Sequence, residues 1–342
     1  MSDQNPIRLA LIGAGIFARD VHLPALQALN DTFEIVAVYS RSQANAAALA
    51  ARLPGQVEAT ADLPALLARD DIEAVNIILP IEVMPEVVEL ALRSGKHVIS
   101  EKPLAPDVAT GRRLVELHAQ NSGQIWLVGE NWRYEDAFEQ AAAIVHSGEL
   151  GRPLLCHWVV YNPINPDNKY YHTPWRRSGG YPGGFLLDVG VHHVAVLRWL
   201  LGEISRVSAV TGQIRADLPP ADILSATLEF ESGVSGVYLA TYAINAPWPP
   251  ELVITGEHGS LRVHRQGLEV TSNGLTRSVP VTPHQGVKKE LAAFAAAIRR
   301  GKPHRNNPPQ CLQDVAVVEA MLRSAEMGRH IAPERIILFG YR

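Results

Sequence analysis

Three side chains of this sequence have the chemistry of an acid–base site. Lys102 lies in a Glu-Lys-Pro turn directly after the short run Val98–Ser100. Asp188 and His192 stand four residues apart, and residues with this spacing share one face of a helix. The lysine supplies a positive charge that can polarise an oxygen atom, and an imidazole titrates near neutral pH, which suits proton transfer. The carboxylate either orients the histidine or acts in its own right.

A glycine turn near the start of the sequence predicts a dinucleotide site. It follows the apolar run Ile7–Ile12 and has the spacing Gly-x-Gly-x-x-Ala. The first glycine allows a sharp turn, the second lets backbone N–H groups approach a pyrophosphate, and the small third residue lets a helix pack on the sheet. The N-terminus of that helix offers N–H donors to phosphate. The residues expected at the cofactor are Gly13, Gly15, Ile16, Phe17 and Ala18.

The residues after the next predicted strand bear on the choice between NAD and NADP. NAD sites usually place Asp or Glu there to accept from the ribose 2′-hydroxyl, but this sequence has Tyr39-Ser40-Arg41-Ser42. Ser40 and Arg41 could bind a 2′-phosphate, because a guanidinium makes charge-assisted bonds to phosphate. The alternative is that Arg41 is a solvated loop residue that tolerates NAD. We therefore predict NAD(P) as the cofactor, with NADP slightly favoured over NAD.

Composition limits the classes of protein to consider. The 342 residues exceed one typical domain, and 47% hydrophobic with 19% charged residues fits a globular chain. A net charge of −4 argues against nucleic-acid binding, and no run reaches the roughly 20 apolar residues of a membrane span. The sequence has no basic, apolar leader before the first predicted strand, and its cysteines are Cys156 and Cys311. We expect a cytoplasmic protein with reduced thiols.

The first 124 residues alternate between two periodicities. Runs rich in valine and isoleucine, typical of strands covered on both faces, alternate with alanine- and leucine-rich helical stretches. This order predicts a parallel, doubly wound sheet in an α/β domain. The predicted strands are Ile7–Ile12, Glu34–Tyr39, Ala74–Leu79, His97–Ser100 and Gln124–Val128, and the predicted helices are Gln43–Arg52, Pro85–Ser94 and Asp107–Asn121.

After about residue 150 the pattern changes to strands joined by short turns, which predicts an antiparallel meander with one face covered by helices. We divide the chain into a dinucleotide-binding domain over 1–124 and a substrate-binding and oligomerisation α+β domain over 125–342, whose last helices could pack back on the first domain. The predicted strands are Pro153–Tyr161, Ile204–Ile214, Leu224–Phe230, Val234–Ala243, Leu252–Thr255, Ser260–His264 and Leu268–Thr271, and the predicted helices are Phe185–Leu201, Val287–Arg300 and Cys311–Met327.

Taken singly, each motif also fits a solvated loop or a helix surface, but together the motifs resemble one family. Gly13-x-Gly15-x-x-Ala18, Glu101-Lys102-Pro103 and Asp188-x-Gly190-x-His192 occur in the order, and at roughly the spacing, of the glucose–fructose oxidoreductase / inositol dehydrogenase / rhizopine catabolism (Gfo/Idh/MocA) family. The resemblance covers essentially the whole chain. It implies an N-terminal Rossmann domain and a C-terminal α/β domain with an open, mostly antiparallel sheet. It also implies hydride transfer between NAD(P) and a sugar, sugar derivative or polyol.

The resemblance further implies roles for single residues. Lys102, Asp188 and His192 would act as catalytic residues at the nicotinamide end, and Glu101 and Lys102 would contact the cofactor. The Lys102–Pro103 bond is a candidate for a cis peptide.

Two positions depart from the family pattern. Where such proteins often read Pro-Asn-x-x-His, this chain has Pro80-Ile81-Glu82-Val83-Met84, so only Pro80 is carried over to the cofactor site. Three residues after the histidine the family often has Asp, whereas this chain has Ala195. No ligand set with the spacing of a catalytic zinc site is evident, so we predict no metal.

Six aromatic residues lie between Trp158 and Tyr181, just before the helix with Asp188 and His192. They either pack within the fold or form a pocket wall that covers a sugar ring. Nearby cations, Arg133, Lys169, Arg176 and Arg177, leave an acidic sugar open as the substrate. The residues predicted to bind substrate are Lys102, Asn131, Tyr161, Trp175, Arg176, Asp188 and His192.

Three functions compete. The first is an NAD(P)-dependent dehydrogenase or reductase with net turnover of the cofactor. The second is an NAD-dependent glycoside hydrolase that uses transient oxidation at C3 and elimination. The third, a non-catalytic sensor, is disfavoured by the intact Lys102, Asp188 and His192. We expect a small-molecule carbohydrate substrate, no nucleic-acid or membrane partner and, by resemblance only, a homodimer or homotetramer.

Overall fold

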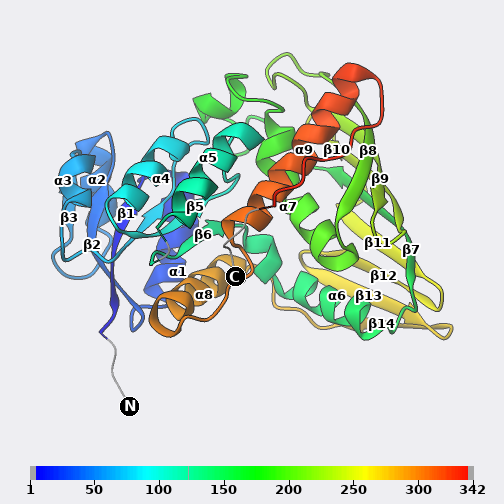
Figure 1. Cartoon of the computed structure of the whole chain (residues 1–342), viewed down its shortest axis with the longest axis horizontal. Helices are drawn as coiled ribbons and strands as arrows, with labels where there is room; N and C mark the ends of the chain where they lie inside the picture. Colours follow the sequence, from blue (N-terminus) through cyan, green and yellow to red (C-terminus); the bar gives the residue numbers. More distant parts are fainter. Residues whose placement is uncertain (1–4, 122, 338–342) are drawn as a thin grey trace. The chain divides into compact units, whose positions relative to one another are not determined.

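The computed structural model describes residues 5–121 and 123–337, which form two compact units. The first unit runs to Glu130 and takes up Val287–Leu312, and the second holds Asn131–Gly286 and Gln313–Ile336. Figure 1 traces the elements of each unit. The boundary that the sequence places at 124/125 falls before strand β6 (Trp126–Gly129), which pairs with the first sheet. The first unit therefore continues past this strand.

The first unit contains a six-stranded parallel sheet in the order β3-β2-β1-β4-β5-β6. This is the doubly wound arrangement that the sequence predicts. The strand order reverses between β1 and β4, and ligands of such sheets bind at this switch point, outside the carboxyl ends of the strands. The strands are β1 (Ile7–Ile12), β2 (Phe33–Tyr39), β3 (Glu58–Thr60), β4 (Ala74–Ile77), β5 (His97–Glu101) and β6 (Trp126–Gly129).

Three helices of the first unit begin with a side-chain cap. The side chains of Ser42, Asp62 and Asp107 accept from backbone N–H groups at the starts of α2, α3 and α5. The sequence predicts α2, α4, α5 and α8 to within a few residues at each end, but not η1, α1 or α3. The helices are η1 (Ala18–His22), α1 (Leu23–Gln27), α2 (Gln43–Ala50), α3 (Leu63–Leu67), α4 (Met84–Arg93), α5 (Val108–Ala119) and α8 (Gly286–Arg300).

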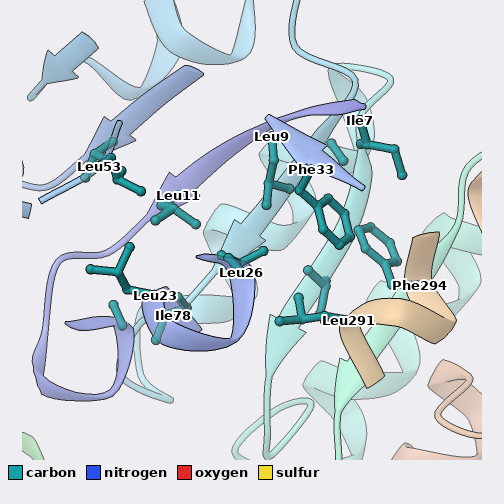
Figure 2. Close-up of a cluster of buried hydrophobic side chains, with 14 of the residues drawn as sticks. Ile7, Leu9, Leu11, Leu23, Leu26, Phe33, Leu53, Ile78, Leu291 and Phe294 are labelled. Atoms are coloured by element: carbon teal, nitrogen blue, oxygen red, sulfur yellow. The ribbon is translucent and has the colours of Figure 1, made fainter. Parts of the chain in front are cut away.

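A late helix completes the core of the first unit. Leu291 and Phe294 of α8 are fully buried in the cluster that contains Leu9 of β1 and Phe33 of β2. Figure 2 shows these side chains pointing toward one another. Burying a side chain of this size contributes roughly 1.5–3 kcal/mol. Helix α8 is therefore part of the fold that carries the glycine turn, although it is distant from that turn in the sequence.

The second unit contains an eight-stranded sheet in the order β14-β13-β12-β11-β7-β10-β9-β8. The sheet is mostly antiparallel, but the prediction of a simple meander is wrong at its centre. There β7 lies between β11 and β10 and pairs parallel with β10. The strands are β7 (Pro153–Tyr161), β8 (Ile204–Gly212), β9 (Ile223–Phe230), β10 (Ser235–Thr241), β11 (Glu251–Gly256), β12 (Gly259–His264), β13 (Gly267–Ser272) and β14 (Leu275–Val279).

A buried ion network fixes the central helix of the second unit. Arg133 donates to both oxygens of Asp314, at 2.9 and 2.7 Å, and Asp314 also pairs with Arg198 of α7. Breaking such a network leaves an uncompensated buried charge, which is strongly destabilising. The helices are η2 (Asn131–Tyr134), α6 (Asp136–Ser147), η3 (Pro174–Arg177), α7 (Phe185–Leu201) and α9 (Pro308–Met327), of which α9 enters this unit from Gln313 onward.

Candidate active site

The glycine turn after β1 has one position that only glycine can occupy. Gly13 has φ +116°, and a Cβ atom there would lie 2.2 Å from the carbonyl oxygen of Ile78. Its N–H donates to the carbonyl of Tyr39 over 2.9 Å. Gly13 thus packs the turn between the ends of β2 and β4, at the switch point of the sheet.

Gly15 differs from Gly13, because its missing side chain leaves open space. A Cβ atom at Gly15 would meet nothing within 4 Å, and the residue is exposed. A continuous helical run over residues 16–27 begins directly after it, and the first N–H groups of a helix have no acceptor within the helix. Ala18 is fully buried in the core, whereas Ile16 and Phe17 are half-buried. An open glycine, a helix N-terminus and a buried small residue fit a pyrophosphate.

The other residues predicted at the cofactor follow neighbouring strands of the same parallel sheet. Ser40 and Arg41 follow β2, Pro80 follows β4, and Glu101 ends β5. Because the strands are parallel, these residues lie at the same edge of the sheet as the glycine turn. Arg41 is exposed, and the hydroxyl of Ser40 accepts from the backbone N–H of Ser42 over 3.3 Å.

The end of β5 carries the Glu-Lys-Pro turn. Glu101 is buried, and its Oε1 lies 2.8 Å from Nε2 of the buried His22. Lys102 follows and is half-buried. The Lys102–Pro103 peptide is cis, which confirms the cis bond that the family resemblance suggests.

A hollow of about 730 Å³ in the first unit contains none of the predicted site residues. It is lined by β3, the starts of β1 and β2, and the end of α2. The guanidinium groups that line it already have carboxylate partners: Arg8 pairs with Glu34 at 3.0 Å and Arg69 with Glu58 at 2.6 Å. This hollow therefore offers no unpaired charge to a ligand, and we do not assign it a function.

In the second unit, two glycines precede α7 for reasons of packing. Gly183 and Gly184 have φ +73° and +52°. A Cβ atom would lie 2.7 Å from the Leu322 side chain at Gly183 and 2.6 Å from the carbonyl oxygen of Pro219 at Gly184. Glycines can let a ligand come close to the backbone, but at Gly183 and Gly184 the chain itself fills the space that side chains would need.

Asp188 lies on the first turn of α7 and is paired with an arginine. The Nε of Arg176 donates to its Oδ2 over 2.9 Å, and the two side chains are 17% and 5% exposed. The Arg176 guanidinium also lies 4.0 Å from the centre of the Trp175 ring and donates to Thr173. The adjacent guanidinium favours the charged form of this buried carboxylate.

His192 stands one turn further along α7, and its ring lies against an indole. The ring centroids of His192 and Trp132 are 5.1 Å apart and the planes differ by 6°. Trp132 belongs to η2 and also lies beneath the guanidinium of Arg265, which pairs with Glu135. His192 is buried, with 8% of it exposed, and the ring contact restrains the orientation of the imidazole.

The next residue, His193, has different surroundings. Its Nδ1 lies 2.7 Å from the hydroxyl of Tyr238, and its ring packs against the edge of Trp158. Burial raises the pKa of Tyr238. Both histidine rings contact Trp132, but His193 meets it edge-on at 5.1 Å and also bonds to the hydroxyl of Tyr238.

Two family models match separate ranges of the chain. The oxidoreductase family described as an NAD-binding Rossmann fold matches residues 7–129, and the GFO/IDH/MocA C-terminal domain matches residues 138–262. The chain belongs to the GFO/IDH/MocA oxidoreductase family. The predicted resemblance is therefore confirmed, and so is an NAD-binding Rossmann domain.

Several relatives match nearly the full chain. A dehydrogenase of Fusarium mangiferae, FPY6, is 34% identical over 93% of this chain and 96% of its own length. The D-apiose dehydrogenase of Paraburkholderia graminis is 26% identical over 94% and 88%. The crystal structure of an oxidoreductase of Thermotoga maritima superposes with a TM-score of 0.90 and 36% identity, covering 97% of this chain and all of that one.

Apart from Lys102, the residues predicted to bind substrate lie on several different elements of the second unit. Asn131 begins η2 beside Trp132, and Trp175 stands beside Arg176. Tyr161 ends β7 and, since side chains alternate along a strand, points to the face opposite the buried Trp158. We therefore leave Tyr161 out of the proposed substrate contacts.

Three residues with a place in these sites were not picked out from the sequence. Trp132 sits between two residues that were considered, Asn131 and Arg133, but the aromatic cluster was counted only from Trp158 onward. No signal in the sequence marks His22 or Asn76, because His22 comes into contact with Glu101 and with Asn76 only in the tertiary fold.

Two further findings concern cations and membranes. Over residues 5–121 and 123–337, no three His, Cys, Asp or Glu side chains group as ligands of a metal ion. The side chains of Cys156 and Cys311 are buried and neither is in a disulfide, and burial raises the pKa of Cys156 to about 12. In the same ranges, none of the helices combines the length and the apolar composition that crossing a bilayer requires.

Proposed function

We propose that this protein is an NAD(P)-dependent dehydrogenase or reductase that acts on a hydroxyl or carbonyl group of a sugar, sugar derivative or polyol. The observation that carries the proposal is the arrangement on α7. There a buried carboxylate is paired with Arg176 and an imidazole is held flat against Trp132, in a chain whose other unit is an NAD-binding Rossmann domain. The similarity to D-apiose dehydrogenase supports a carbohydrate substrate.

The cofactor would be held by the glycine turn and its neighbours at the edge of the parallel sheet. Backbone N–H groups from Gly15 to Ala18 would bind the pyrophosphate, and Pro80 and Glu101 would line the same edge. When bound, the nicotinamide accepts or supplies a hydride. Lys102 would polarise the substrate oxygen, as a positive charge aimed at developing negative charge does in general.

We assign the proton transfer to His192. Asp188 is already committed as a carboxylate to the Arg176 guanidinium, so it is poorly suited to accept a proton. The imidazole of His192 would take the proton of the substrate hydroxyl during oxidation and return it to the carbonyl oxygen during reduction. Asp188 would then stabilise the imidazolium that forms on the same face of the helix.

The arginines of the second unit favour an uncharged substrate. Arg133 is buried against Asp314, and Arg176 is bound to Asp188. Arg177 donates to the backbone carbonyl of Asp217 and packs 4.1 Å above the Tyr171 ring. Each of these cations is engaged by the protein itself, so an acidic sugar would have to displace a partner. A neutral sugar or polyol that meets Asn131, Trp175 and the tip of His192 requires no such exchange.

We propose NADP as the preferred cofactor. The support is the stretch Tyr39–Ser42 at the end of β2, which has no acid to accept from a ribose hydroxyl and carries the exposed Arg41. A guanidinium beside Ser40 suits a 2′-phosphate.

The open face of the second sheet supports an oligomer. Leu155 of β7 and Val237 of β10, which are neighbouring strands, are 58% and 46% exposed, and Val210 of β8 is 72% exposed. Apolar groups gathered on one sheet face suit an interface between copies of the chain. We propose a homodimer or homotetramer, which light scattering on the purified protein would test; a monomer at micromolar concentration would contradict it.

The experiment that tests the function is a fluorescence screen for nicotinamide reduction. Neutral sugars, polyols and sugar acids would be offered with NAD and with NADP. Sustained formation of NADPH with a neutral sugar or polyol is the expected result. Cleavage of aryl glycosides without added cofactor would instead indicate the redox-neutral hydrolase, and binding of a dinucleotide without turnover of any compound would indicate a sensor.

A further inference from the structure

Three buried polar side chains form a chain within the first unit, directly behind the Glu-Lys-Pro turn. Nδ2 of Asn76 in β4 lies 2.9 Å from Nδ1 of His22 in η1, and Nε2 of His22 lies 2.8 Å from Oε1 of Glu101. Their exposed fractions are 0%, 1% and 9%. None of the three roles proposed above for Lys102, Asp188 and His192 involves these three hydrogen-bonded side chains.

The chemistry of the amide sets the direction of the hydrogen bonds. The Asn76 amide nitrogen donates, so Nδ1 of His22 is the acceptor and the ring proton sits on Nε2. That proton is donated to Glu101. Oδ1 of Asn76 is buried without a hydrogen-bond partner. An unsatisfied buried acceptor costs stability, so the orientation of the amide that fixes the histidine has an energetic cost.

The carboxylate of Glu101 is confined from more than one side. The edge of the Phe17 ring packs on His22, with centroids 5.2 Å apart. Gly129 of β6 leaves room for the carboxylate, because a Cβ atom there would lie 3.2 Å from Oε1 of Glu101. Well-packed apolar residues are often as stabilising as a buried polar network. Stability alone therefore does not explain why polar side chains occupy these three buried positions.

We propose that His22 is a positioning residue for Lys102 and acts through Glu101. Lys102 is bonded directly to Glu101 in the backbone, so a fixed carboxylate fixes the peptide from which the lysine side chain extends. The proposal rests on the proposed function for the role of the lysine, but not for its geometry. A displaced catalytic group of this kind lowers turnover by roughly 10- to 100-fold.

The test compares His22→Met with His22→Gln in the full-length protein. Both replacements have similar length, but only glutamine keeps an N–H that can donate to Glu101. His118→Met is the matched control, since His118 is a buried histidine of the same unit that bonds to the backbone carbonyl of Gln124. If His22→Met does not fold, His22→Asn takes its place, because its amide is too short to reach the carboxylate.

The first readout is the split between kcat and KM. We expect His22→Met to lower kcat roughly 10- to 100-fold with little change in KM or in the dinucleotide Kd, and His22→Gln to recover most of the loss. His118→Met should leave kcat close to the wild-type value. Equal kcat for the two methionine variants, or no recovery with glutamine, would overturn the proposal.

The second readout needs no substrate, so it separates this proposal from the proposed function. Competitive acetylation with acetic anhydride, followed by mass spectrometry, measures the reactivity of Lys102 relative to the other lysines. His22→Met should change the rate at Lys102 alone, and His118→Met should change none. An unchanged rate at Lys102 would refute positioning even if the enzyme proved active, while a changed rate would support it even if no sugar were turned over.

Discussion

The cofactor unit and the substrate unit hold their functional residues by different means. In the first, backbone geometry defines the site: Gly13 has a positive φ against Ile78, Gly15 is open, and parallel strands bring their ends to one edge. In the second, side-chain contacts define it: Arg176 holds Asp188, and Trp132 holds His192. The first site should therefore be sensitive to an added methyl group, and the second to the loss of one charge or one ring.

The largest effect should come from the imidazole in the side-chain-defined site. His192→Ala removes the proposed proton acceptor and should lower kcat by about 10²- to 10⁴-fold, while dinucleotide binding changes little. His193→Ala is the control, because it removes an adjacent buried imidazole that bonds to Tyr238. Steady-state kinetics and dinucleotide titration measure both. A similar kcat loss in the two variants would mean that packing of α7, and not proton transfer, limits the rate.

In the backbone-defined site, replacing either of two nearby glycines by alanine should affect a different property: stability at Gly13 and dinucleotide binding at Gly15. Gly13→Ala places a Cβ atom 2.2 Å from the Ile78 carbonyl oxygen at a positive φ. This should lower the free energy of unfolding by roughly 2–5 kcal/mol, measured by urea denaturation. Gly15→Ala meets no neighbour, so it should keep the stability and weaken dinucleotide binding. Loss of stability at Gly15, or unchanged dinucleotide affinity there, would contradict the pyrophosphate assignment.

The same contrast explains what the sequence could predict. The alternation of strand and helix, the glycine spacing and the limits of β1, β7 and α7 follow from local periodicity, so the Rossmann sheet was predictable. The parallel pairing of β7 with β10 was not predictable, because it pairs residues as distant in sequence as Leu155 and Ser235, in a register that only the assembled sheet fixes. The hydrogen bonds of His22 and the ring contact of His192 with Trp132 also depend on tertiary packing.

A smaller effect should follow from removing the partner of Asp188. Arg176→Gln withdraws the charged donor from a buried carboxylate and should lower kcat by roughly 10- to 30-fold, since Asp188 would then compete with His192 for the proton. Arg177→Gln is the matched control, because Arg177 donates to the backbone of Asp217 instead. A double-mutant cycle with Asp188→Asn measures the coupling. If Arg176→Gln and Arg177→Gln had equal kcat, the division of roles between Asp188 and His192 would fail.

The smallest expected effect concerns cofactor choice, where a side chain acts in the backbone-defined site. Arg41→Ala should raise the Kd for NADP by roughly 3- to 10-fold and leave the Kd for NAD nearly unchanged, because only NADP carries the 2′-phosphate. The effect is small because Arg41 is exposed and water screens its charge. Raising the salt concentration should reduce the difference further. Arg19→Ala, which removes an exposed arginine paired with Asp20 on the neighbouring helix, controls for a general loss of positive charge. Equal weakening of both cofactors by Arg41→Ala would show that this arginine does not read the phosphate, and the cofactor site would then be defined by the backbone alone.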